Sequence, residues 1–285
     1  MTTMAVAAGK PCALDALVVL LRALKLPAFT RYAEEVATKA TREGWTFGRY
    51  LQHLAELEVE ERRIRRIDRA LHDSDLPGEK TLATLDRARL PPKVTKLLAS
   101  LCDGSFVERG ENLLVFGLPG RGKSHVVAAI GHELIQRGYR VLFTPTFALV
   151  QRLLAAKRDL RLERELAALD IYHAVILDDI GYVQQSRDEM EVLFTFLAER
   201  YERKSVLITS NLVFSDWIRI FKDPMTTAAV IDRLIHHAVI LEMTGASFRN
   251  EAARKRGDAT PATTTTTTTT TDQKTTTTPE ANGEM

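Results

Sequence analysis

The sequence predicts an α/β fold in which a parallel sheet is covered by helices on both faces. Between Glu111 and Thr244, short apolar runs alternate with helical segments, and this alternation is typical of a parallel sheet. A glycine-rich loop joins the first run to a helical segment, so strand, loop and helix follow one another. The predicted strands are the runs NLLVFG, YRVLFT, AVILDD, SVLITS and AVILEM.

The segments on either side of this region have other patterns. Residues 14–100 are helical in pattern, with apolar residues at helical spacing. Beyond Gly257 the chain consists largely of threonine and cannot bury a core, so residues 258–285 are predicted to form a disordered Thr-rich tail. The apolar stripe predicted for the N-terminal helices comprises Phe47, Tyr50, Leu54, Leu57, Ile64, Ile67 and Leu71.

Composition limits the classes of function. The 285 residues are 45% hydrophobic, which is enough to bury a sizeable core. The net charge is only +2, so a nucleic acid must be bound by local basic patches. Cys12 and Cys102 lack metal-ligand spacing, which favours ordinary thiols and a cytoplasmic location. The stretch LDALVVLLRALKL contains Asp15, Arg22 and Lys25, so we expect it to be too short and too charged to span a membrane.

The loop after the first predicted strand has the spacing of a phosphate-binding loop. Its backbone N–H groups are expected to point at phosphate oxygens, and the N-terminus of the next helix favours their negative charge. Lys123 is expected to reach the β- and γ-phosphates, and the Ser124 hydroxyl to bind Mg²⁺. A structural turn with an incidental lysine is the alternative, which the flanking strand and helix disfavour. The predicted nucleotide-binding residues are Gly117, Leu118, Pro119, Gly120, Arg121, Gly122, Lys123, Ser124 and His125.

Two aspartates end the third predicted strand. In phosphate-loop NTPases, a carboxylate at the end of a neighbouring strand holds Mg²⁺, so Asp178 is assigned to the metal, directly or through water. Asp179 is then expected to polarise the attacking water. Acids in this place also occur as caps or turn residues, but the phosphate loop upstream favours the catalytic interpretation.

Two more candidates lie further along the chain. Asn211 follows the fourth predicted strand and is expected to orient water near the γ-phosphate, although asparagine is also a common turn former. Arg233 lies beside Asp232 on an amphipathic segment before the last strand. It is either a solvated surface residue or an arginine finger acting on a neighbouring subunit. His236 and His237 have no acid or cysteine at metal-ligand spacing, and we interpret them as structural.

Four segments carry a resemblance to a known family. In this order, GLPGRGKSH, ILDDIGY, TSN and AVIDRLIHHAVILEMTGASFR resemble the IstB family of AAA+ ATPases. These are helper proteins of a class of bacterial insertion sequences and relatives of the DnaC helicase loaders. The segment from Arg49 to Asp86 also resembles that family, so the resemblance covers most of Leu20 to Arg249. The LDDIGY and DRLIHHA forms are its most specific parts.

The resemblance implies an ATP-binding and Mg²⁺-binding P-loop NTPase that hydrolyses ATP slowly and is stimulated by assembly, DNA or a partner. It implies a ring-shaped or helical homo-oligomer on duplex DNA that recruits or activates the transposase of the same insertion sequence. On this basis residues 1–100 are expected to form a helical domain that binds DNA or a partner, and residues 101–257 an AAA+ ATPase domain without a lid. Asp179 stands where many AAA+ proteins carry glutamate.

Two basic segments are candidates for DNA contact. In the first, Glu58 and Glu61 precede Arg62 and Arg65 by one helical turn, so an ion-paired solvated face and a phosphate-binding face both remain open. In the second, the resemblance to DnaC relatives favours residues 157 and 158. The candidates are Arg62, Arg63, Arg65, Arg66 and Arg69, followed by Arg152, Lys157, Arg158, Arg161 and Arg164.

Two other functions remain open. A helicase loader similar to DnaC would bind single-stranded DNA and a replicative helicase, whereas the N-terminal region favours the transposition helper. A small-molecule kinase would also use a phosphate loop, but it has no need of Asn211, Arg233 or a basic N-terminal helix.

Overall fold

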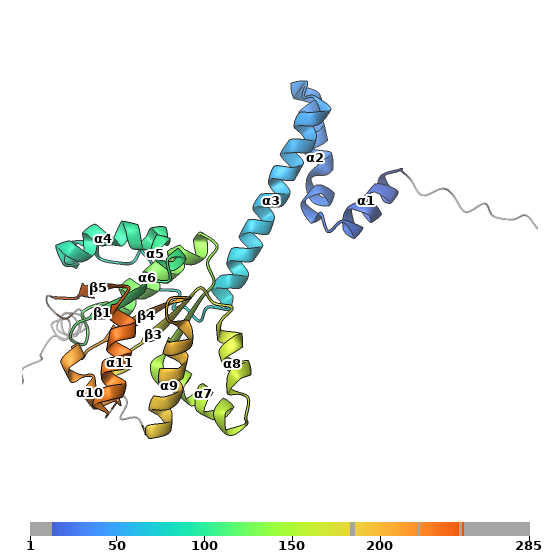
Figure 1. Cartoon of the computed structure of the whole chain (residues 1–285). Helices are drawn as coiled ribbons and strands as arrows, with labels where there is room; N and C mark the ends of the chain where they lie inside the picture. Colours follow the sequence, from blue (N-terminus) through green and yellow to red (C-terminus); the bar gives the residue numbers. More distant parts are fainter. Residues whose placement is uncertain (1–12, 183–185, 222, 245–246, 248–285) are drawn as a thin grey trace, which may run out of the picture. The chain divides into compact units, whose positions relative to one another are not determined.

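The sheet predicted from the sequence is present. A computed structural model of the chain describes residues 13–182, 186–221, 223–244 and 247, so the predicted Thr-rich tail and Cys12 lie outside the described residues. The five strands are all parallel and follow the order β2-β3-β4-β1-β5 (Figure 1). The strands are β1 (Asn112–Phe116), β2 (Val141–Pro145), β3 (Ala174–Asp178), β4 (Ser205–Ser210) and β5 (Ala238–Glu242).

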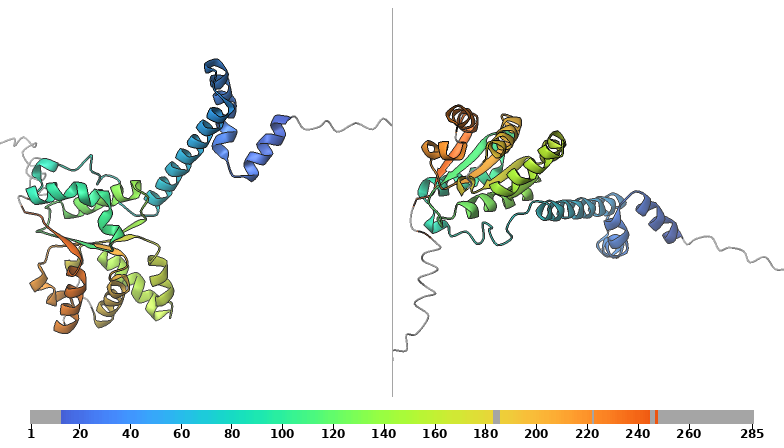
Figure 2. Two further views of the ribbon diagram at one scale, coloured as in Figure 1. Left: turned by 45° about the horizontal axis from the view of Figure 1, so that its top comes forward. Right: turned by 90° about the horizontal axis from the view of Figure 1, so that it is seen from below.

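Helices cover both faces of this sheet (Figure 2). The end of α3, with α4 and α6, packs on one face, and α7, α9, α10 and α11 pack on the other. The helices are α1 (Ala13–Ala23), α2 (Pro27–Glu43), α3 (Phe47–His72), α4 (Pro92–Asp103), α5 (Ser105–Glu108), α6 (Lys123–Gln136), α7 (Thr146–Arg158), α8 (Leu162–Leu169), α9 (Arg187–Arg200), α10 (Ile218–Phe221) and α11 (Pro224–Ile235). Short 3-10 turns lie at Arg87–Arg89, Ile180–Tyr182 and Phe214–Asp216.

One set of strands therefore serves two hydrophobic cores. Successive residues of a strand point to opposite faces of the sheet. In β1, Leu113 and Val115 join the core shared with α6, whereas Leu114 and Phe116 join the core shared with α9. All four side chains are buried, which explains why the run is continuously apolar instead of alternating.

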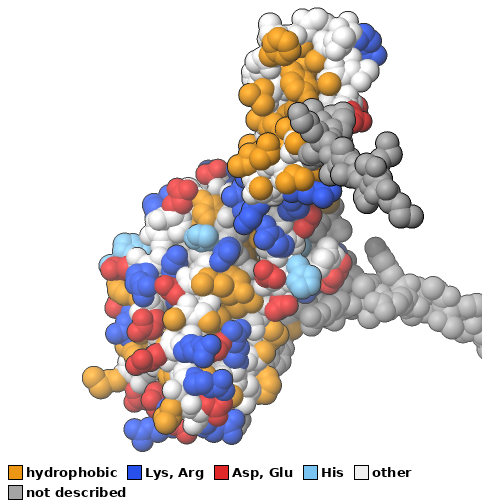
Figure 3. Space-filling view, turned by 90° about the vertical axis from the view of Figure 1, so that its right-hand side faces the viewer, with side chains coloured by type: hydrophobic (Ala, Val, Ile, Leu, Met, Phe, Trp, Pro, Cys, Tyr) orange, Lys and Arg blue, Asp and Glu red, His pale blue; other side chains and the backbone are white. Residues whose placement is uncertain are grey.

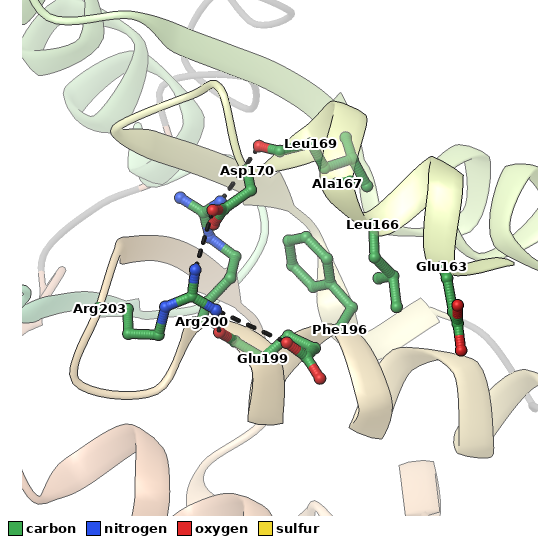
Figure 4. Close-up of a pocket in the computed structure, with 9 residues that line it drawn as sticks. All are labelled: Glu163, Leu166, Ala167, Leu169, Asp170, Phe196, Glu199, Arg200 and Arg203. Carbon is green, nitrogen blue, oxygen red and sulfur yellow. Dashed lines mark hydrogen bonds and ion pairs between the residues drawn. The ribbon is translucent and has the colours of Figure 1, made fainter.

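A buried arginine anchors the amino ends of the strands (Figure 4). Arg200 of α9 is only 3% exposed, and its Nη2 donates hydrogen bonds to the carbonyl oxygens of Tyr172 (3.0 Å) and Ser205 (3.2 Å). Burial lowers the pKa of Arg200 to about 10, so the guanidinium stays charged at neutral pH. Beside it, Arg203 donates to Asp170 at 2.9 Å and links α9 to the end of α8.

Helices α2 and α3 pack against each other as an antiparallel pair. Gly44 ends α2 with a φ of +64°, and the Thr46 side chain caps α3. The buried Glu58 carboxylate of α3 accepts a hydrogen bond from the Ala28 N–H at 2.8 Å, so it caps the start of α2. This interaction holds the two helices in register.

The apolar stripe predicted along α3 is buried only in part. Leu54 and Ile67 are buried, but Phe47 is 94% exposed and Ile64 is also exposed, so the prediction was wrong for these two residues. Helix α2 covers only the N-terminal half of α3, and the core beneath α6 begins at Ile67. Phe47 lies at the tip of the helical pair, and Ile64 lies between the two covered stretches.

The segment that follows α3 packs on the sheet. Leu85, Leu90 and Val94 belong to the core beneath α6 together with Ile67. Cys102 of α4 is also buried there, and burial raises the pKa of its thiol to about 11, as expected of an unreactive core cysteine. Among the helices in the described part of the chain, none is long and apolar enough to cross a membrane.

Candidate active site

Three groups of predicted site residues meet at the carboxyl edge of the sheet. Strand β4 lies between β1 and β3, so the ends of these three strands are neighbours. The phosphate loop follows β1, Asp178 ends β3, and Asn211 follows β4. Ligands of open parallel sheets bind at this edge. The sheet order thus brings together residues that are far apart in the sequence.

Two glycines allow the phosphate loop to adopt its path. Gly122 precedes α6 with a φ of +84°, a conformation that strains other residues. At Gly117 the chain passes close to the end of β5, and a Cβ atom there would lie 2.6 Å from the carbonyl oxygen of Met243. A side chain at either position would distort the loop.

Lys123 is the first residue of α6 and lies inside the loop. It is only 8% exposed, and its Nζ donates hydrogen bonds to the carbonyl oxygens of Gly117 (2.7 Å) and Leu118 (3.2 Å). Its ammonium is therefore held close to the loop backbone that is expected to surround the phosphates. Ser124 follows as the second residue of the helix.

Two other side chains of the loop are turned toward the protein. Arg121 donates to the Met243 carbonyl oxygen at 3.2 Å. The Nε2 atom of His125 lies 3.1 Å from the Thr81 carbonyl oxygen and 3.2 Å from the Thr84 hydroxyl. These contacts fasten the loop to β5 and to the segment after α3. Residues 121 and 125 would therefore contact a phosphate through their backbone N–H groups, not through their side chains.

Thr209 connects strands β3 and β4 at the site, and it is not among the residues predicted from the sequence. Its hydroxyl donates to Asp178 Oδ1 at 2.6 Å and accepts from the Asp179 N–H at 2.8 Å. The Asp178 carboxylate is thereby oriented by a fully buried side chain of β4. In the sequence, Thr209 is visible only as a polar residue near the end of an otherwise apolar strand. Its hydrogen bond to Asp178 could not be predicted from that pattern, because it depends on the order of the strands in the sheet.

Asp179 has a strained backbone. Its φ is +66°, which residues other than glycine rarely adopt, and its N–H bond to Thr209 helps to hold it there. Strained residues of this kind cluster at active sites, where the surrounding structure maintains them.

Asn211 has an unsatisfied oxygen in the site. Its Oδ1 atom is buried, and no residue within the described ranges donates a hydrogen bond to it. A Cβ atom added to Gly181 would lie 2.0 Å from this oxygen. An unsatisfied buried oxygen costs about 1–3 kcal/mol, so a ligand or water that donates to it would be bound favourably. The absence of a side chain at position 181 leaves room for the amide.

We therefore expect Gly181→Ala to lower the rate of ATP hydrolysis by roughly 10²-fold, because displacement of a positioning group by about 1 Å has effects of that size. ATP affinity should change little, since the phosphate loop is not touched. Phosphate release and nucleotide titration measure the two quantities. Gly78→Ala is the matched control, because a Cβ atom there meets nothing within 4 Å. A Gly181→Ala protein as active as the control would remove Asn211 from the proposed chemistry.

Arg233 is the one predicted catalytic residue that the sheet does not bring to this edge. It lies near the end of α11, which leads into β5 at the amino edge of the sheet, where Ala238 pairs with Asn112. Its guanidinium lies 4.8 Å from the ring centroid of Phe194, and its Nη1 is buried without a hydrogen-bond partner among the described residues. Its own phosphate loop is at the opposite edge.

Ion pairs between described residues occupy three of the five arginines of α3 that are candidates for DNA contact. Arg62 donates to Glu58 and to the Lys25 carbonyl oxygen, and Arg63 donates to Glu60 through two nitrogens. Arg65 pairs with Glu61 one turn before it and with Glu58 two turns before it. Of the five predicted arginines of this helix, Arg66 and Arg69 make no ion pair with a described residue. The ion pairs favour the solvated-face interpretation for Arg62, Arg63 and Arg65.

Three basic side chains of the second predicted segment, which begins in α7, also form ion pairs. Lys157 of α7 pairs with Asp188 (3.3 Å) and Glu191 (2.9 Å), and the hydrogen bond with Glu191 raises the pKa of Lys157. Arg152 pairs with Glu165, and Arg161 with Asp159. These charges link α7 to α8 and α9, so they favour folding of the subunit over contact with DNA.

The residues at the carboxyl edge fit ATP and Mg²⁺. The enclosed Lys123 ammonium and the glycine loop suit phosphate oxygens, and hydroxyl and carboxylate oxygens are the ligands that Mg²⁺ prefers. The unsatisfied Asn211 oxygen adds a polar position for water beside them. With the order of its strands, this site defines a P-loop NTPase of the AAA+ type.

The chain belongs to the family described as IstB-like ATP binding protein, whose model matches residues 19–256. It is 44% identical over 244 residues to an insertion-sequence ATP-binding protein of Sinorhizobium fredii, covering 84% of this chain and 82% of that protein. It is also 36% identical to the insertion sequence IS21 ATP-binding protein of Pseudomonas aeruginosa, covering 86% of this chain and 92% of the relative. The family expected from the motifs is thus confirmed.

Solved structures of replication proteins share the fold. DnaI is similar with a TM-score of 0.50 at 22% identity, covering 60% of this chain and 96% of that chain. The replication initiator DnaA, in a structure bound to AMPPCP and single-stranded DNA, is similar with a TM-score of 0.52 at 14% identity, covering 65% of this chain and 56% of that chain. At these identities the likeness concerns the fold alone.

Proposed function

We propose that this protein is an ATP-dependent helper of transposition. It hydrolyses ATP, forms a ring-shaped or helical homo-oligomer on duplex DNA in the cytoplasm, and recruits or activates the transposase of its insertion sequence. Family membership and the names of its insertion-sequence relatives support this proposal. Residues 1–100 would bind DNA or the partner, and residues 101–257 would form the ATPase domain.

The observation that carries the proposal is the constellation at the carboxyl edge of the sheet. Lys123 would bind the β- and γ-phosphates, and Ser124 and Asp178 would hold Mg²⁺, which neutralises charge on the phosphates when bound. Asp179 would polarise the attacking water, and Asn211 would orient it through its unsatisfied oxygen. Thr209 would position the carboxylate of Asp178.

The N-terminal helices carry features of a partner-binding surface. Apolar side chains gather over this part of the molecule in Figure 3. Val19 and Leu20 of α1, Leu24 just after it, and Phe47 and Leu51 of α3 are all exposed. Such exposed apolar surface usually marks an interaction site. It supports the assignment of this region to contact with a protein partner.

A basic hollow between α3 and the sheet is the best candidate for contact with DNA phosphates. The hollow has a volume of about 390 Å³, and its lining includes Arg66, Arg69 and Arg140, with Asp73 as its acidic residue. Arg66 and Arg140 are exposed, and neither forms an ion pair within the described parts of the chain. Free guanidinium groups from two elements are suited to a phosphodiester backbone.

Arg66→Ala combined with Arg140→Ala is expected to weaken binding to duplexes of unrelated sequence by similar factors. The slope of log K against log salt should become shallower by about two units, because each lost phosphate contact removes about 0.9. Fluorescence anisotropy at several salt concentrations measures this slope. The matched control is Arg63→Ala, since Arg63 is already paired with Glu60. A slope equal to that of the control would exclude the hollow as a phosphate site.

The identity of the partner decides between the helper and a helicase loader. The unmodified protein with ATP should co-purify with the transposase encoded by the same element and should not retain a replicative helicase. Electron microscopy with ATP and duplex DNA should show ordered oligomers on the DNA. Selective retention of the helicase, with a preference for single-stranded DNA, would instead favour the loader.

A further inference from the structure

A cluster of metal-ligand side chains lies at the amino edge of the sheet, away from the nucleotide site. Glu202 Oε1 lies 3.6 Å from His236 Nδ1 and 3.6 Å from His237 Nε2. The three ligand atoms all lie within 4.8 Å of one another. The interpretation of the two histidines as structural rested on the lack of a nearby acid in the sequence. The fold supplies that acid from the turn after α9.

The spacing of these atoms suits a tetrahedral ion. Bonds of Zn²⁺ to imidazole nitrogen and carboxylate oxygen are about 2.0–2.2 Å long, so neighbouring ligand atoms in a tetrahedron lie roughly 3.3–3.5 Å apart. The two distances of 3.6 Å are within reach of this value by small rotations of the side chains. All three residues are exposed, so an ion can enter from solvent.

The backbone at these positions is fixed by the sheet. The carbonyl oxygen of His237 accepts a hydrogen bond from the N–H of Asn112 at 2.7 Å, at the first residue of β1. The backbone of Glu202 packs against Gly110, where a Cβ atom would lie 3.2 Å from the Glu202 carbonyl group. Both parts of the cluster therefore rest on the same end of β1. Ligands held on such rigid elements lose little freedom when they bind an ion.

We propose that Glu202, His236 and His237 bind a transition-metal ion, with Zn²⁺ as the natural candidate. Two imidazoles and one carboxylate favour such ions over Mg²⁺ and Ca²⁺, which prefer oxygen ligands. Water would occupy the fourth position of the tetrahedron. The ion would tie the end of α9 to the start of β5 and so stabilise the folded subunit.

Tyr201 is the neighbouring group that would orient a ligand. Its hydroxyl lies 3.0 Å from His236 Nδ1. When the ion is bound, the phenol would donate to the Glu202 carboxylate. Such supporting hydrogen bonds are common around metal ligands.

Titration of the nucleotide-free full chain with Zn²⁺ tests the proposal. Calorimetry should show one equivalent whose affinity falls by at least about tenfold in Glu202→Gln and in the double variant His236→Asn with His237→Asn. Zn²⁺ should also raise the melting temperature of the unmodified protein, Mg²⁺ should not, and the increase should be lost in the variants. Glu202→Gln is nearly isosteric and exposed, so it remains informative if the double variant does not fold.

His72→Asn provides the matched control, because His72 also faces a carboxylate, Asp73, at 3.4 Å but belongs to no group of three ligand side chains among the described residues. This variant should bind Zn²⁺ as the unmodified chain does. Equal stoichiometry and affinity in Glu202→Gln would overturn the proposal, as would the lack of saturable Zn²⁺ binding by the unmodified chain. Neither readout depends on ATP hydrolysis, so the result is independent of the proposed function.

Discussion

Lys123→Ala is expected to abolish ATP binding. The Lys123 ammonium lies within the phosphate loop, 2.7 Å from the Gly117 carbonyl oxygen. Hydrogen bonds to charged groups contribute about 1.5–3 kcal/mol each, so the loss of two such bonds to phosphate should weaken binding by at least about 100-fold. Isothermal titration with ATP and Mg²⁺ measures the change.

Two controls separate this effect from a loss of folding. Lys123→Gln keeps a hydrogen-bond donor without the charge and should also lose most of its affinity, while both variants should melt near the temperature of the unmodified protein. Asp179→Ala should retain ATP but hydrolyse it poorly, since Ser124 and Asp178 would still hold the metal. Normal ATP affinity in both Lys123 variants would contradict the assignment of the whole site.

The local parts of the site were predictable from the sequence. An apolar run, a glycine loop and a helical pattern lie within about thirty residues of one another, so the phosphate loop depends on short-range geometry. Asp178 and Asn211 were predictable as strand ends for the same reason. Their proximity follows once β4 is known to lie between β1 and β3.

Contacts between distant segments were not predictable in this way. The hydrogen bond from Thr209 to Asp178 depends on which strands are neighbours, and the approach of Glu202 to His236 depends on where α9 ends. The burial of α3 was overestimated at Phe47 because helical periodicity shows which residues share a face but not how far a partner helix extends.

The partners of the basic side chains were the feature that the sequence predicted least well. The pattern of α3 showed acids one turn before Arg62 and Arg65, and both pairs form. It did not show that Lys25 also binds Arg62 through its carbonyl oxygen, or that Arg140 from another element lies beside Arg66. The free guanidinium groups could be identified only after the chain had been folded.

Arg233→Ala is expected to fold and bind ATP but to hydrolyse it poorly. β1 has five residues and is therefore roughly 16 Å long, and Arg233 lies toward its amino end, whereas the phosphate loop follows its carboxyl end. An arginine so placed cannot reach its own nucleotide, so a catalytic role requires that it act on the nucleotide of a neighbouring subunit. Arginine fingers contribute roughly 10³–10⁵ in rate in well-studied GTPases, so even a weaker one should be detectable as a loss of at least tenfold.

A structural role predicts a different outcome for the same variant. The guanidinium lies over the ring of Phe194, and a partly buried cation–π contact contributes about 0.5–2 kcal/mol, so its loss should lower the melting temperature without preventing ATP binding. Arg233→Lys keeps the positive charge but lacks the planar guanidinium group, and we expect it to hydrolyse ATP little faster than Arg233→Ala. Full activity of the lysine variant would indicate that only a positive charge is needed.

Mixed assemblies test whether Arg233 acts between subunits. Arg233→Ala subunits keep an intact phosphate loop, and Lys123→Ala subunits keep an intact arginine. In an assembly of both, some interfaces combine the intact loop of one subunit with the intact arginine of its neighbour, so ATP hydrolysis should exceed the sum of the two variants measured separately. Co-assembly on duplex DNA must be shown in the same sample by labelling one variant. If co-assembled mixtures hydrolyse ATP no faster than that sum, Arg233 does not serve the neighbouring site, and its contact with Phe194 is its main role.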